Sequence, residues 1–102
     1  MAQKALVRAG HTVIPFHPRG GEIDGLEVVT AMSDIEQPVD TVTVYVRPAI
    51  LETMMGALTQ LNPKRVILNP GTEDEGLARE LREAGIEVEE ACTLVMLNTG
   101  QY

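Results

Sequence analysis

Three short loops in this chain combine a cationic or polar side chain with proline and glycine. They are residues 16–21, the pair Arg47-Pro48, and residues 69–72. Prolines restrict such loops, and glycines let backbone N–H groups come close to a ligand. This combination is suited to holding an anion such as a phosphate group. The residues that we expect to contact a ligand are His17, Pro18, Arg19, Arg47, Pro48, Asn69, Pro70, Gly71 and Thr72.

The first loop discriminates between nucleotide cofactors. NAD sites place an Asp or Glu near the end of the second strand, where its carboxylate holds the ribose diol. If a further strand precedes residue 1, that position falls at or near His17, which is no carboxylate. Arg19 and two glycines follow it, a combination that suits the ribose phosphate of NADP or coenzyme A. The alternative is a solvated Arg19 in a flexible loop.

The other two loops also have structural interpretations. Arg47 could hold a phosphate or carboxylate bidentately, or could pair with one of the many acidic side chains. Thr72 could cap the helix that follows, with Glu75 three residues further on as a capping box. Cys92 stands beside an apolar run, which favours a packed thiol over a nucleophile. The chain has no nucleophile elbow, Walker loop or zinc-protease motif, so the sequence assigns no reaction.

Helices and strands alternate along the chain. We expect strands at 11–16, 41–46, 65–68 and 86–89, with a short extended piece around 26–28. We expect helices at 1–10, at 49–61, from the third loop to residue 84, and briefly within 91–102. This order predicts an α/β fold, a doubly wound and mainly parallel sheet flanked by helices. The apolar stripe expected on the helix at 49–61 is Ile50, Met54, Ala57, Leu58 and Leu61. The carboxyl ends of parallel strands share one edge, which gathers the three loops there.

Composition limits the classes of function. The 102 residues suffice for one domain, and 8 basic against 15 acidic residues give a net charge of −7. Such a domain repels nucleic-acid backbones, so no nucleic-acid partner is expected. No apolar run is long enough to span a membrane. The single cysteine excludes an intramolecular disulfide and fits a cytoplasmic location, and Cys and His spacing gives no metal site.

The start of the chain is unusual for this fold class. A doubly wound sheet has its first strand at the centre, followed by a glycine-rich loop that binds phosphate. Nothing ahead of the first expected helix supplies either part. One interpretation is a fold that begins with a helix. The other, which we favour, is a domain without its N-terminal strand, whose exposed neighbouring strands would lead two copies to associate as a homodimer.

Together these segments resemble the small bacterial and archaeal CoA-binding domain proteins, a Rossmann-like family related to the alpha subunit of succinyl-CoA synthetase. The segments that match are 10–18 with 20–23, 39–42 leading to Arg47-Pro48, 69–73, and 92–95. The chain lacks the family's first strand and loop, and it has His17 where the family often has Asn. The resemblance implies one CoA-binding-like domain over 1–102 that binds coenzyme A or an acyl-CoA without a known reaction. The alternatives are a fragment of an NADP-dependent oxidoreductase and an oligomerisation scaffold without a ligand.

Overall fold

The structure is a computed structural model that describes residues 2–102. The chain forms two compact units. The hairpin unit comprises residues 2–36 together with residues 94–102, and the sheet unit comprises residues 37–93. Each unit is described in turn, because each has its own secondary structure.

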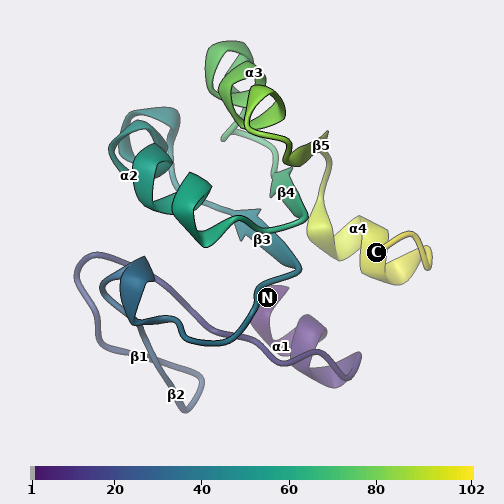
Figure 1. Cartoon of the computed structure of the whole chain (residues 1–102). Helices are drawn as coiled ribbons and strands as arrows, with labels where there is room; N and C mark the ends of the chain where they lie inside the picture. The colour runs from purple at the N-terminus through teal and green to yellow at the C-terminus, as the bar shows by residue number, and fades with distance from the viewer. Residues whose placement is uncertain (1) are drawn as a thin grey trace. The chain divides into compact units, whose positions relative to one another are not determined.

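The sheet unit is a β-α-β-α-β layer. Strands β3 (Thr41–Val44), β4 (Arg65–Leu68) and β5 (Glu87–Glu90) are parallel and follow one another in the order β3-β4-β5. Helix α2 (Pro48–Leu61) joins the first two strands and α3 (Glu75–Glu83) joins the last two, and the two helices contact each other (Figure 1). The last residues of the strands lie in register, so all three carboxyl ends meet at one edge. The parallel α/β sheet flanked by helices is confirmed.

Local sequence explains where these helices begin and end. Pro48 occupies the first turn of α2, where a missing N–H costs nothing. Asn62 ends α2 in the left-handed conformation, with φ of 53°, and Pro63 follows. Asp74, not Thr72, caps α3: its carboxylate accepts a hydrogen bond of 3.0 Å from Leu77 N. The expected capping box is therefore wrong, because the helix starts later than that pattern requires.

The core of the sheet unit centres on β4. Its residues Val66, Ile67 and Leu68 have no exposed surface, as expected of the middle strand of a parallel sheet. Both β3 and β5 pair with β4 alone among the described residues, so each lies at an edge of this sheet. Helix α2 buries Leu51, Met55 and Leu58, so the expected stripe is wrong at all positions except Leu58.

The hairpin unit holds helix α1 (Ala2–Arg8) and an antiparallel hairpin of β1 (Glu22–Ile23) and β2 (Leu26–Glu27). It also holds the 3-10 helix η1 (Met32–Asp34), and all of α4 (Thr93–Asn98) after its first residue. The expected strand at 11–16 is wrong: its only pairing is an isolated parallel bridge from Phe16 to Val29. A strand requires a neighbour along its length, and these residues have none in the structure. The first residue of the expected N-terminal helix lies outside the described residues. No helix among residues 2–102 has both the length and the apolar character needed to cross a membrane.

Candidate functional site at the carboxyl edge of the sheet

Arg47 is the cation of this edge. It is the N-cap of α2, three residues beyond the end of β3, and its side chain is exposed. Within residues 2–102 its guanidinium has neither an ion pair nor a hydrogen bond, so the expected alternative of an acidic partner is not found there. The fork of donors therefore stays available to a phosphate or a carboxylate. Pro48 fixes the backbone directly after it.

Asn69 is buried at the end of β4 and binds the protein itself. Its side chain is 1% exposed, and Nδ2 donates a hydrogen bond of 2.9 Å to the carbonyl of Val44. Oδ1 accepts a bond of 2.8 Å from Thr93 N. Through these two bonds one amide joins the ends of β3 and β4 to the start of α4. Asn69 therefore shapes the edge, whatever it contributes to a ligand.

The N–H groups of the loop after β4 are taken up internally. Gly71, with φ of 92°, donates its N–H to the Glu73 carboxylate at 2.7 Å. Thr72 is 5% exposed, and both its N–H and its hydroxyl bond to the carbonyl of Asn69. Pro70 is exposed and has no N–H to donate. The loop thus carries a carboxylate where an incoming phosphate would need a donor.

Two side chains absent from the predicted site residues lie at the same edge. Thr93 is fully buried. Tyr45 directly follows β3 and is 55% exposed. The pKa of the Tyr45 hydroxyl is raised, because burial raises it, a hydrogen bond with the Thr93 side chain lowers it, and the nearby Cys92 raises it. No sequence signal marked these two residues, because Tyr45 fell inside the strand expected at 41–46 and Thr93 stands in an apolar run.

Three of the predicted residues, His17, Pro18 and Arg19, belong to the hairpin unit. The other six belong to the sheet unit. They form a turn in which His17 O accepts from Gly20 N and His17 Nδ1 accepts from Arg19 N at 3.1 Å. The ring nitrogen of His17 therefore stabilises its own loop. The Arg19 side chain is exposed and has no bonded partner within residues 2–102. Both loop arginines thus keep their donors.

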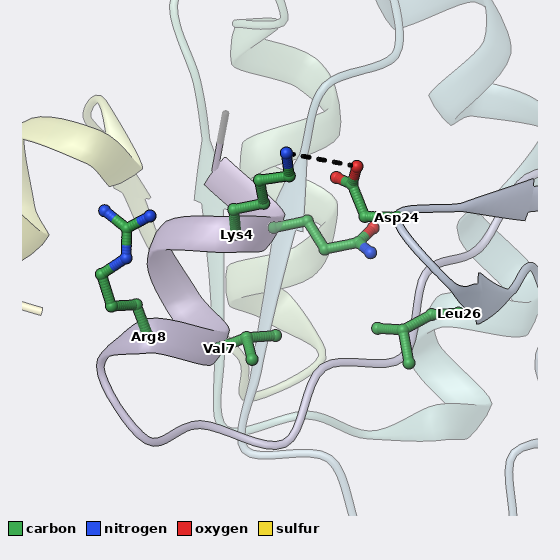
Figure 2. Close-up of a pocket in the computed structure, with 6 residues that line it drawn as sticks. Lys4, Val7, Arg8, Asp24 and Leu26 are labelled. Carbon is green, nitrogen blue, oxygen red and sulfur yellow. Dashed lines mark ion pairs between the residues drawn. The ribbon is translucent and has the colours of Figure 1, made fainter.

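A hollow of about 460 Å³ lies elsewhere in the hairpin unit, between α1 and the β1–β2 hairpin. Figure 2 shows Val7 and Leu26 pointing toward each other across it and Lys4 paired with Asp24, at 3.7 Å. None of the nine predicted residues lines it. The ion pair offsets one of its two cations, which leaves the exposed Arg8. No group of three metal-binding side chains occurs in the described part of the chain.

The carboxyl edge fits different parts of a nucleotide unequally. A phosphate fits Arg47, whose guanidinium is exposed and unpaired within residues 2–102. It does not fit the loop after β4, where Glu73 already holds the N–H of Gly71 and Asp74 and Glu75 follow. A negatively charged group is therefore favoured beside Arg47, and an uncharged group is favoured beside the loop after β4.

Parallel strands joined by helices, with polar loops at their carboxyl ends, define a Rossmann-like α/β domain. Within that class the chain belongs to the family described as CoA binding domain, whose model matches residues 1–98. None of the curated proteins compared with the chain matches it.

Several solved structures share this fold. A protein described only as uncharacterized is 38% identical, with a TM-score of 0.87 over 99% of this chain and 83% of that one. A Thermus thermophilus protein is 30% identical, with a TM-score of 0.86 over 99% of this chain and 77% of that one. A hypothetical protein from Pyrococcus horikoshii is 20% identical, with a TM-score of 0.87 over 95% of this chain and 69% of that one, and shows the fold alone.

Proposed function

We propose that this chain binds coenzyme A or an acyl-CoA at the carboxyl edge of the sheet, as a cytoplasmic sensor or carrier. The family match over residues 1–98 supports the ligand class. The observation that carries the site is Arg47, an exposed guanidinium without a partner in residues 2–102, in a chain with 15 acidic residues. A cation left unpaired among so many carboxylates is well placed for an external anion. Among residues 2–102, no side-chain constellation for a reaction accompanies it.

Arg19, in the hairpin unit, is proposed from the sequence pattern alone to contact a ribose phosphate, and this contact is tested separately from the carboxyl edge. A charge-assisted contact contributes about 1.5–3 kcal/mol, and less where solvent screens it. We therefore expect CoA and NADP to bind about ten-fold more tightly than dephospho-CoA and NAD. Titration calorimetry with these four compounds tests this directly. Equal affinities with and without the ribose phosphate would remove Arg19 from the site.

The role of Arg47 is tested by a charge-matched pair of variants. Arg47→Ala should weaken CoA binding about ten-fold and leave the melting temperature nearly unchanged, because the side chain has no partner to lose. Arg79→Ala removes an exposed positive charge from α3 and should leave CoA binding unchanged. Equal affinities in both variants would contradict a site at Arg47. Preference for NADP over CoA would favour the oxidoreductase alternative, and absence of any binding would favour the scaffold.

A further inference from the structure

The charge of the chain is unevenly distributed along its length. Residues 2–21 carry three basic side chains, Lys4, Arg8 and Arg19, and no acidic one. All 15 acidic residues and the other five basic residues follow, so residues 22–102 carry a net charge of −10. Helix α1 therefore carries two cations in a chain whose remainder is strongly acidic. A small anion that is repelled elsewhere on the chain is favoured beside this helix.

The hollow between α1 and the β1–β2 hairpin has an apolar middle. Val7 and Leu26 point toward each other across it, and Val7 is 50% exposed (Figure 2). Ile23 pairs with Leu26 across the hairpin and is 46% exposed, so both side chains lie on one face of that hairpin. The volume of about 460 Å³ lies within the range of about 300–1,000 Å³ of small-molecule sites. A ligand that covers these apolar side chains gains affinity from removing them from water.

Two polar contacts join α1 to the hairpin beside these apolar side chains. Gln3 Nε2 donates a hydrogen bond of 2.8 Å to the Ile23 carbonyl, and Lys4 Nζ lies 3.7 Å from the Asp24 carboxylate. These contacts hold the two walls of the hollow together and occupy the polar groups of three of its six lining residues. Arg8, the remaining charged residue of the lining, is exposed and has neither an ion pair nor a hydrogen bond within residues 2–102. The hollow therefore has one uncompensated positive charge.

We propose that this hollow binds an aliphatic carboxylate, with its hydrocarbon chain between Val7 and Leu26 and its carboxylate on Arg8. The hydrocarbon leaves water when it covers the two apolar side chains. A guanidinium forms two parallel hydrogen bonds with a carboxylate, and one negative charge matches the one uncompensated cation. An uncharged hydrocarbon would leave Arg8 without a partner, and a polyanion would be repelled by the acidic remainder of the chain. The site is independent of the proposed CoA binding, since none of the residues expected to contact CoA lines it.

Titration of the wild-type chain with octanoate, followed by the amide chemical shifts in NMR spectra, tests the site. The largest shifts should fall on residues 3–8 and 23–26, which surround the hollow. Hexanoate should bind up to about four-fold more weakly for each methylene that it lacks, the effect of one buried methylene. Absence of binding, or shifts centred on other residues, overturns the proposal.

Two pairs of variants separate the contribution of the hydrocarbon from that of the charge. Val7→Ser should weaken binding of octanoate and of 1-octanol about three-fold, whereas Val95→Ser, at a similarly exposed valine of α4 outside the hollow, should change neither. Arg8→Gln should weaken binding of octanoate alone about three-fold, the effect of one solvent-exposed ion pair, whereas Arg79→Gln on α3 should change neither. Unchanged affinity for octanoate in either Val7→Ser or Arg8→Gln overturns the proposal.

Asp24→Asn should increase affinity, an effect that partial unfolding cannot produce. Asp24 has φ of 49°, a left-handed conformation that Asn also adopts, so the hairpin turn should persist. The substitution releases Lys4 from its ion pair and should strengthen binding of octanoate about two- to three-fold, because a second cation then becomes available to the carboxylate. Weaker or unchanged binding in this variant overturns the placement of the carboxylate. Self-association of the wild-type chain that Val7→Ser abolishes would assign the hollow to a second copy and would also overturn the proposal.

Discussion

Asn69 offers the sharpest test of how the carboxyl edge is built. Replacing it with Ala removes the bond of 2.9 Å to the Val44 carbonyl and the bond of 2.8 Å from Thr93 N. The first loss costs about 1 kcal/mol, because Val44 O keeps only a longer bond of 3.4 Å from Asn69 N. The second leaves a buried N–H without its partner, which costs about 1–3 kcal/mol.

Together these losses predict that Asn69→Ala lowers the free energy of unfolding by about 3 kcal/mol. For a domain of this size each kcal/mol lowers the melting temperature by roughly 4–8 °C, so we expect a fall of more than about 10 °C. Thermal and urea unfolding followed by circular dichroism measure both quantities. A loss this large is a substantial part of the 5–15 kcal/mol typical of native proteins.

The control is Asn98→Ala at the end of α4. Asn98 is exposed, and its side chain has no bond among the described residues, so this substitution should change stability by no more than about 0.5 kcal/mol. If Asn69→Ala unfolds at the same temperature as Asn98→Ala, then Asn69 does not hold the strand ends together. The reasoning from its two hydrogen bonds would then be refuted.

Two further predictions concern α3 and Tyr45. Asp74→Ala should cost about 1 kcal/mol through loss of the bond to Leu77 N, and Asp74→Asn should restore stability because an amide oxygen also caps; equal melting temperatures for both variants would contradict the cap. In Tyr102→Phe the only tyrosine is Tyr45, whose ionisation can be followed by the ultraviolet absorbance of the phenolate. Its pKa is raised by burial above the ordinary value of about 10, so its stabilising contribution is complete below that pH and is lost as the pH rises through the folded pKa. A folded midpoint at or below that of the denatured chain would be the opposite result.

Strong local signals predicted the parallel part of the fold. The run of β-branched residues gave β3 within two residues, and β4 was predicted with its exact bounds, because a short apolar run between turn residues has few alternatives. Proline at the start of α2 and Asn62-Pro63 at its end fixed that helix. Residues 11–16 have a similar pattern, but the strand predicted there is wrong. Strand formation depends on a neighbouring strand, which no local pattern reveals.

Two adjacent stripes explain the wrong face of α2. Ile50, Met54 and Leu61 follow helical spacing as well as Leu51, Met55 and Leu58 do, so periodicity alone could not choose between them. The structure buries the second set and leaves the first half-buried. Which face of α2 is buried depends on how the whole helix packs against its neighbours, and the spacing of apolar residues does not specify this.

The placement of the loops was predictable from the sequence, but the roles of their side chains were not. Parallel topology alone places the loops after β3 and β4 at one edge, and the structure confirms that placement for residues 47–48 and 69–72. Asn69 and Thr72 had the polar groups expected of ligand contacts, yet both side chains bond within the protein. Whether a polar side chain at a strand end faces a ligand or its own backbone depends on burial, which residue type does not settle.

The net charge of the chain bears on how it could bind the anionic ligand proposed above. The chain carries −7 overall, so it repels a polyanion at long range and cannot steer one inward. This repulsion is largely screened beyond about 8 Å at physiological ionic strength, so affinity must come from groups in direct contact. Three of the cations are paired with carboxylates, at 3.7–4.0 Å, whereas Arg47 is unpaired among the described residues. If the chain binds CoA as proposed, the negative charge of the ligand must therefore be met by direct contact with an unpaired cation such as Arg47.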